Sequence, residues 1–158
     1  MGVVMSRREL FNQVASELGY DFSGEIKVGG NYVPILKHEN LIYISGQIPR
    51  VGDKVVIQGA VGGAVTLEDA QKAAKVCVMR ALALVNQSVG LDAVKGVLRI
   101  SVYVQSVNGF TQQSEVSDGA SEVLHKVFGD VGIHTRTSVG VYQLPKNAPV
   151  EIDLIFAI

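Results

Sequence analysis

The chain has 158 residues, of which 47% are apolar and 18% charged, which excludes a disordered segment and fits a single domain with a filled core. Lysine and arginine (14) nearly balance aspartate and glutamate (15), so the basic excess typical of nucleic-acid-binding proteins is missing. One cysteine, Cys77, excludes an internal disulfide, and no apolar run is long enough to span a membrane. With no secretory signal at the N-terminus, these features predict a cytoplasmic domain without a membrane partner.

The first segment is predicted to be a helix. Ser6 and Glu9 have the spacing of a capping box, and an apolar stripe follows until Gly19, a typical helix stop. Residues 20–30 are rich in glycine and show no periodicity. We therefore interpret residues 1–30 as a helix and connector appended to a main domain, residues 31–158.

The main domain alternates strand and helix patterns. Apolar alternation and runs predict strands, while stripes with helical spacing between an N-cap and a glycine predict helices. In chain order the predicted elements are strands at 32–36, 41–45 and 54–57, a helix at 66–90, a strand at 97–105, a helix at 110–128, and strands at 137–143 and 150–157.

This order predicts an α+β fold in which a β-sheet carries both helices of the main domain on one face. Within the strand at 97–105, Leu98 is expected to point to the same side as Ile100 and Val102. The last strand alternates Ile152, Leu154 and Phe156 with Glu151, Asp153 and Ile155, which we interpret as too apolar to leave the second face of the sheet in water. We therefore expect copies of the chain to associate through that face.

The usual catalytic and metal-binding signatures are absent from the sequence. The three histidines, His38, His125 and His134, are far apart in the chain and none has a partner at metal-ligand spacing. Cys77 lies among alanines on the apolar stripe of a helix, where a thiol is a packing group.

The C-terminal third offers a possible site. Arg136 lies near the N-terminal end of a predicted strand, where a guanidinium can bind a carboxylate through two parallel hydrogen bonds. Glu151 opens the next strand, and a glutamate beside such a group can activate water. Taken alone, the residues favour the simpler alternative that both are ordinary charges at strand ends.

Four short motifs change this balance because together they resemble one family. They are Ser45-Gly46-Gln47-Ile48-Pro49, Arg136-Thr137-Ser138-Val139, Leu144-Pro145 and Val150-Glu151-Ile152. In order and spacing they are similar to the RidA family of reactive intermediate deaminases, also labelled YjgF or L-PSP endoribonuclease proteins. The resemblance covers about residues 30–158.

The resemblance implies a chorismate-mutase-like α+β fold assembled as a homotrimer. It also implies hydrolysis of enamines and imines such as 2-aminoacrylate to 2-oxoacids and ammonia, without a metal or cofactor. Arg136 would bind the carboxylate of the imino acid, and Glu151 would be associated with the attacking water.

Four further residues are placed near the ligand by the same resemblance. Tyr32 would line the site, and the backbone of Gly46 would border it. Ser114 and Ser138 stand where the better-known members have an asparagine and a cysteine, so substrate preference is expected to differ.

Two other functions are compatible with the sequence. A non-catalytic module that binds small carboxylates would use the same Arg136. An endoribonuclease or translation inhibitor is also a family label, although the near-neutral charge disfavours a nucleic-acid partner.

Overall fold

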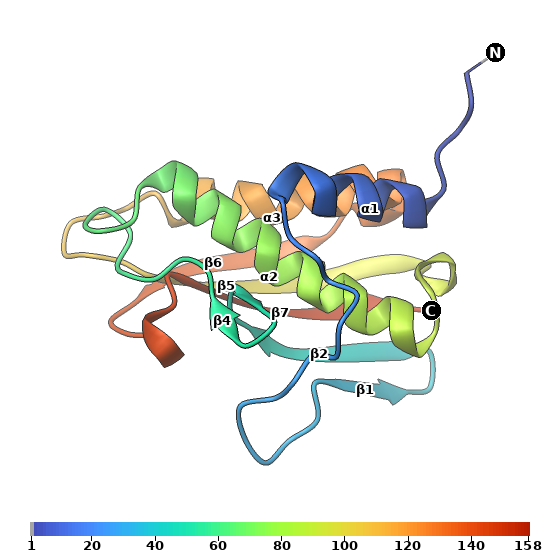
Figure 1. The fold of residues 1–158 in the computed structure, drawn as a ribbon, viewed down its shortest axis with the longest axis horizontal. Coiled ribbons are helices and arrows are strands. Elements are labelled where there is room, and N and C mark those ends of the chain that lie inside the picture. The colour runs from blue at the N-terminus through green and yellow to red at the C-terminus, as the bar shows by residue number, and fades with distance from the viewer. Residues whose placement is uncertain (1) are drawn as a thin grey trace.

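A computed structural model describes residues 2–158 and shows a five-stranded sheet with three helices on one side (Figure 1). The predicted α+β class is confirmed. The helices are α1 (Arg7–Leu18), α2 (Leu67–Ser88) and α3 (Gln113–Phe128), and the strands of the main sheet are β1 (Ile35–His38), β2 (Leu41–Gln47), β5 (Gly96–Gln105), β6 (Thr135–Val141) and β7 (Val150–Ala157). Within residues 2–158, no helix combines the length and apolar composition that crossing a bilayer requires.

The strand order β1-β2-β7-β5-β6 places the last strand in the middle of the sheet. β7 runs antiparallel to both β2 and β5, whereas β5 and β6 are parallel and are joined by α3. Because β5 lies between β6 and β7, the motif strands that carry Arg136 and Glu151 are not neighbours.

The central helix α2 fits closely on the sheet because its contact face is made of small residues. Thr66 caps its first turn by accepting a hydrogen bond from the backbone of Asp69. Ala70, Ala73 and Ala74 are completely buried, and short side chains let a helix backbone approach its neighbours closely.

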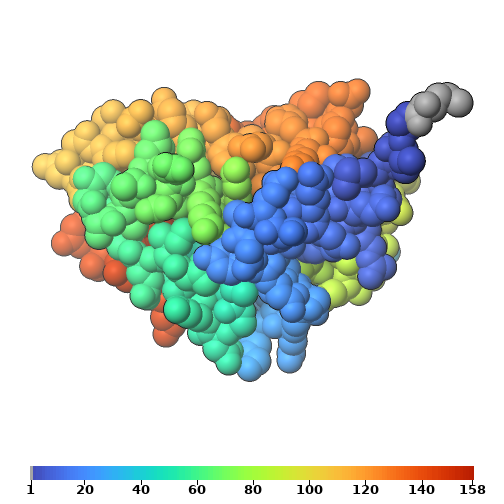
Figure 2. Space-filling view, turned by 45° about the horizontal axis from the view of Figure 1, so that its top comes forward, coloured from blue at the N-terminus to red at the C-terminus, as the bar shows by residue number. Residues whose placement is uncertain are grey.

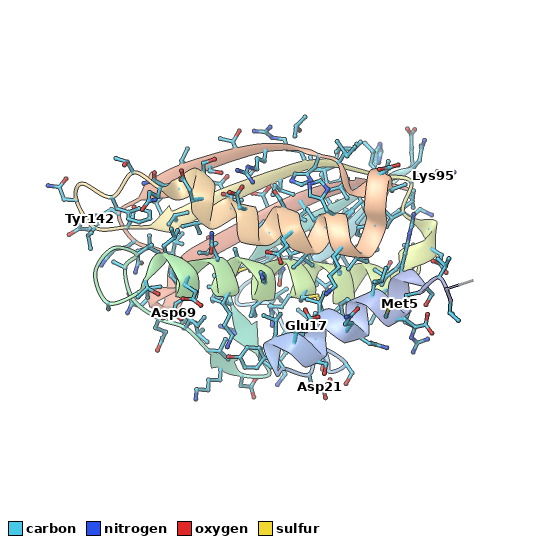
Figure 3. All side chains as sticks on the ribbon, turned by 90° about the horizontal axis from the view of Figure 1, so that it is seen from above. Met5, Glu17, Asp21, Asp69, Lys95 and Tyr142 are labelled. Atoms are coloured by element: carbon cyan, nitrogen blue, oxygen red, sulfur yellow. The ribbon has the colours of Figure 1, made fainter. Side chains whose placement is uncertain are left out.

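Helices α2 and α3 lie side by side over the sheet (Figure 3). At Gly119 of α3 the backbone of α2 leaves no room for a side chain. A Cβ atom at position 119 would collide with the backbone carbonyl of Gln71 in α2, which cannot rotate away. We expect Gly119→Ala to lower the free energy of unfolding by about 1–3 kcal/mol, because it overpacks this contact. Urea unfolding should show the loss, and Gly24→Ala, where the added methyl meets open space, is the control. Equal stability of both variants would contradict this account of the helix contact.

The N-terminal helix is part of the core, so the expectation of an appendage was wrong. Phe11 and Val14 of α1 are buried, and Phe22 of the connector packs edge-on against Phe11. Arg7 donates hydrogen bonds to the carbonyl oxygens of Leu91 and Val94 at 2.8 and 2.7 Å. Figure 2 shows the blue N-terminal segment lying against the orange of α3 and the green of α2.

An ion pair adds to this packing between α1 and α3. Glu17, labelled in Figure 3, accepts a hydrogen bond of 2.9 Å from Lys126 of α3. The capping box predicted at Ser6 and Glu9 is present in both directions, and Gly19 ends the helix in the left-handed region with φ of 77°.

Several strand boundaries differ from the expectation. The first strand begins only after Pro34, so Tyr32 lies in the connector rather than in the sheet. The strand expected at 54–57 is shorter: β4 (Lys54–Val55) pairs with β3 (Arg50–Val51) in a separate hairpin. β6 begins at Thr135, which places Arg136 inside a strand and not ahead of it.

Leu98 does not point inward as expected, because the register of β5 against β7 shifts between Val97 and Arg99. This irregularity buries Val97 and turns Leu98 outward. The alternation predicted for the following residues holds, and Ile100 and Val102 are fully buried beneath the helices.

The last strand does not make the second face of the sheet apolar in the way that was expected. Ile152, Leu154 and Phe156 face the helices and are buried, so they do not contribute to the uncovered face. That face instead carries Tyr43, Tyr103 and Val139 among charged and hydroxyl groups.

Candidate functional site

Tyr32, Gly46 and Glu151 come together in one cleft, although they lie far apart in the chain. Gly46 belongs to β2, Glu151 to β7, and Tyr32 to the connector that runs past the end of this strand pair. The cleft has a volume of about 170 Å³, which suits a ligand smaller than the drug-sized molecules held by pockets of roughly 300–1,000 Å³.

The carboxylate of Glu151 is the acidic group of this cleft. It is half-buried, and it forms no ion pair with any cation of residues 2–158. Burial, and then the negative charge of nearby Asp153, raises the pKa of Glu151 above its ordinary value. A carboxylate with a raised pKa is a stronger proton acceptor than an ordinary one.

Gly46 gives Glu151 the space it occupies. A Cβ atom at position 46 would lie 2.5 Å from the Glu151 Oε1 atom and 3.0 Å from its carboxyl carbon. The glycine thus lets the carboxylate lie directly against the backbone of β2. This contact excludes a side chain at position 46, which the resemblance places at the border of the ligand.

Arg136 lies outside the cleft, held against α3. Its Nη2 atom pairs with Asp118 at 2.8 Å and donates to the hydroxyl of Ser114 at 2.9 Å, while its Nη1 atom donates to Ser121 at 2.9 Å. The Nε–H group takes no part in these bonds. Ser114 and Arg136, which were each predicted to border the ligand, are thus in direct contact, with Asp118 as a further partner that the sequence did not indicate.

Ser138 lies two residues further along β6, and its hydroxyl is hydrogen-bonded to Ser117 of α3 at 2.5 Å. The six predicted residues thus form two groups: one in the cleft, and one of Arg136, Ser114 and Ser138 along β6 and α3. Within residues 2–158, no hydrogen bond or ion pair connects the two groups.

The sheet register shows why the two groups are separate. Arg136 pairs with Ile100, which pairs with Leu154, whereas Glu151 pairs with Tyr103. Two strand spacings and three residues along β7 therefore separate Arg136 from Glu151, about 14 Å between their Cα atoms. Their side chains also start on opposite faces of the sheet, so a small ligand cannot contact both within one chain.

His134 is linked to Arg136 through Ser121, although the sequence indicated only isolated histidines. The rings of His125 and His134 lie 5.4 Å apart, which corrects the expectation that all three histidines are distant from one another. His134 Nδ1 lies 2.7 Å from the carbonyl oxygen of Gly132 and must donate to it, so Nε2 of the neutral ring accepts from Ser121 at 2.8 Å. Ser121 in turn accepts from Arg136.

This arrangement predicts a pH dependence of stability. Burial lowers the pKa of His134, and the charges of His125 and Arg136 lower it further, because a proton on its ring would face the guanidinium. The unfolded chain therefore takes up a proton first as the pH falls below about 6.5, and stability is lost in that window. We expect the His134→Gln variant to lose less stability between pH 7.5 and 5.5 than the unmodified protein does, as measured by urea unfolding. The exposed His38→Gln variant is the control. An unchanged pH dependence in His134→Gln would contradict the assignment of this stability loss to His134.

Sequence reasoning missed the cationic groups of the cleft, above all Arg80 of α2. Arg80 is 6% exposed, and its guanidinium donates to the side chain of Gln47 at 3.0 Å and to the carbonyl of Arg50 at 2.6 Å. A signal was present: Arg80 is the only charged residue in the run from Val76 to Val85, in which every residue is buried.

Neither a metal site nor a reactive thiol is found in the described part of the chain. No three histidine, cysteine, aspartate or glutamate side chains of residues 2–158 gather in a way that could hold a metal ion. Cys77 is completely buried, and burial raises the pKa of its thiol, which keeps it protonated.

Known proteins resemble this chain along nearly its whole length. The sequence profile of the Endoribonuclease L-PSP family matches residues 22–158. Protein TCP17 of Trypanosoma cruzi is 36% identical over 157 residues, which are 98% of this chain and 97% of that protein. The crystal structure of Atu1372, a protein of unknown function from Agrobacterium tumefaciens, is 36% identical, with a TM-score of 0.85 over 96% of this chain and 94% of the other.

A more distant structure shares the fold. The TdcF protein of E. coli, solved with bound serine, is 19% identical, with a TM-score of 0.62 over 87% of this chain and 95% of the other. The profile match and the two relatives at 36% identity cover nearly the whole chain. The chain therefore belongs to the L-PSP endoribonuclease family, the RidA-like family that the motifs around Gly46, Arg136 and Glu151 resemble.

Proposed function

We propose that the protein hydrolyses reactive 2-imino acids, and their enamine tautomers, to 2-oxoacids and ammonia. The observation that carries this proposal is the half-buried carboxylate of Glu151, which faces a small cleft beside Gly46 and Tyr32 and has a raised pKa. Such a group is suited to transfer a proton to and from water next to an electrophilic carbon.

The proposed reaction needs one water molecule and one acid–base group. Glu151 takes a proton from water as the water oxygen bonds to the imine carbon, giving a tetrahedral carbinolamine. Glu151 returns this proton to the nitrogen, which completes the carbinolamine. Glu151 then takes the proton of the new hydroxyl and passes it to the nitrogen as well, so that the carbon–nitrogen bond breaks, the carbonyl forms and ammonia leaves. Because free imines hydrolyse spontaneously, a modest acceleration by orientation and one proton relay is enough.

The carboxylate of the imino acid would be bound by Arg136 of a neighbouring copy. This follows because Arg136 and Glu151 of one chain cannot reach one small ligand, whereas a head-to-tail ring brings different surfaces of two copies together. We therefore propose a homotrimer with one site at each of its interfaces. Light scattering at micromolar concentration should report three times the chain mass of 16.9 kDa, and a monomer would exclude a shared site.

A coupled assay tests the proposed reaction directly. A pyridoxal-phosphate dehydratase generates an imine from serine or threonine, and the release of 2-oxoacid is followed with and without this protein. We expect faster release in its presence. If no imine is hydrolysed faster while the 2-oxoacids still bind, the protein is a non-catalytic carboxylate-binding module.

The same preparation should be incubated with single-stranded RNA, because the family name includes endoribonuclease activity. The formal net charge of −1 supports the imine and not the RNA as substrate. RNA cleavage that is abolished by Glu151→Gln, without any effect on imines, would overturn the proposal.

A further inference from the structure

The cleft around Glu151 contains more positive charge than one carboxylate ligand requires. Four cationic side chains line it, Lys27, Arg50, Arg80 and Lys146, and Glu151 is its one carboxylate. Lys27 has a partner outside the cleft, the exposed Asp53 at 3.5 Å. The other three form no ion pair with any carboxylate of residues 2–158.

Arg80 is the most unusual of these cations because it is buried. Its guanidinium donates to two neutral oxygens, those of the Gln47 amide and the Arg50 carbonyl, so its charge is not compensated by these bonds. Burial lowers the pKa of Arg80, and the neighbouring charge of Arg50 lowers it further. Proteins rarely bury a charge without a counter-ion, since taking it out of water is costly. An anion in the cleft would supply the missing charge.

Arg50 adds a second, independent sign of a missing partner. Its Nε atom is buried and has no hydrogen-bond partner within residues 2–158. Buried N–H groups in native structures almost always have an acceptor, so this unpaired donor, on a side chain that also lines the cleft, marks a missing partner.

The turn that carries Lys146 is held in place at the rim of the same cleft. Lys146 and Asn147 both adopt left-handed backbone conformations, with φ of 59° and 58°. Hydrogen bonds fix this unfavourable geometry: Gln58 donates to the Lys146 carbonyl at 2.8 Å, and Gln105 donates to the Asn147 side chain at 2.7 Å. A strained turn maintained by specific bonds is typical of a functional position.

We propose that this cleft selects ligands with a second acidic group, and that Arg80 and Arg50 bind this group as a carboxylate. The inference rests on the proposed function for the class of ligand, a 2-imino or 2-oxo acid, and it adds an acidic side chain to that class. The 2-imino end lies beside Glu151, and the distal carboxylate extends to the two arginines. Its negative charge balances the guanidinium of Arg80, and its oxygen atoms accept from the unpaired N–H of Arg50.

Calorimetric titration tests this subsite without requiring turnover. The probes are 2-oxoglutarate and 2-oxopentanoate, which have the same five-carbon chain but differ in the distal carboxylate. We expect 2-oxoglutarate to bind at least about 10-fold more tightly, the effect of one or two hydrogen bonds to a charged group. The preference should weaken at high salt, because it depends on charge.

Two variants and one control assign the preference to the arginines. In Arg80→Gln the ratio of the two affinities should fall to about one, within the error of the titration. Because Arg80→Gln could disturb the buried Gln47, Arg50→Met provides a second variant: it removes a group whose Nε has no partner and should also reduce the ratio. Lys54→Gln, which removes an exposed cation on the same hairpin but outside the cleft, should leave the ratio unchanged.

The outcomes separate this inference from the proposed function. Equal affinities for the two probes in the unmodified protein, or an unchanged ratio in both arginine variants, would overturn the acidic subsite even if imines are hydrolysed. A clear preference for 2-oxoglutarate that both variants remove would support the subsite, even if the coupled assay shows no hydrolysis.

Discussion

Replacing Glu151 with glutamine is expected to slow imine hydrolysis by about 10²- to 10⁴-fold, the usual contribution of a general acid–base group. The same change is expected to stabilise the protein at neutral pH. Because burial raises the pKa of Glu151, the folded protein keeps its proton to a higher pH than the unfolded chain does. Stability is therefore lost as the pH rises from about 4.5 through the folded pKa, and glutamine removes this loss. Urea unfolding at pH 4 and 7.5, beside the coupled assay, measures both effects.

Asp153 provides a matched control for this prediction. It lies two residues along the same strand, and burial raises its pKa as well, but it does not line the cleft. Asp153→Asn should share the stabilisation at neutral pH and slow turnover far less than Glu151→Gln, because it removes only a charge that raises the pKa of Glu151 and leaves the acid–base group in place. If both variants lose turnover equally, or if Glu151→Gln retains it, Glu151 is not the acid–base group.

Replacing Arg136 with lysine is expected to slow the reaction by about 30- to 1000-fold, although the charge is kept. A lysine has no planar fork, so it cannot hold a carboxylate by two parallel bonds and fix the position of the adjacent carbon. It also cannot reproduce the simultaneous contacts with Ser114, Asp118 and Ser121. The loss should appear in kcat/KM measured with the coupled assay.

Arg99→Lys is the appropriate comparison, because Arg99 is an exposed arginine on the neighbouring strand and bonds to Thr137 of β6. It should retain normal kinetics. Unfolding curves for both variants show whether lost activity reflects lost structure. Normal oxoacid release by a folded Arg136→Lys protein would exclude Arg136 as the residue that binds the substrate carboxylate.

Local patterns in the sequence were enough to predict the helices and the class of fold. The capping box at Ser6 and the N-cap at Thr66 describe interactions within a few residues, so they can be recognised without knowing the fold. The bulge that exposes Leu98 and the core position of Phe11 depend on partners far along the chain. No local pattern contains that information.

The candidate site shows the same limit. The motifs singled out Gly46, Arg136 and Glu151, but the separation of Arg136 from the other two follows from β5 lying between β6 and β7. The order of strands in a sheet is set by packing and cannot be derived from spacing. Arg80 could have been noticed as the one charge in a buried run, yet its place beside the cleft depends on contacts with Gln47 and Arg50, which come from another part of the chain.

In the proposed trimer, Arg136 of one copy and Glu151 of another act on the same ligand. Co-expressing Arg136→Ala and Glu151→Gln chains in equal amounts tests this arrangement, because each variant alone is inactive and mixed trimers contain some interfaces with both intact residues. Random mixing in a head-to-tail ring gives both residues at about one quarter of the interfaces, so about a quarter of the unmodified oxoacid release is predicted. Activity no higher than that of either variant alone would contradict the shared site.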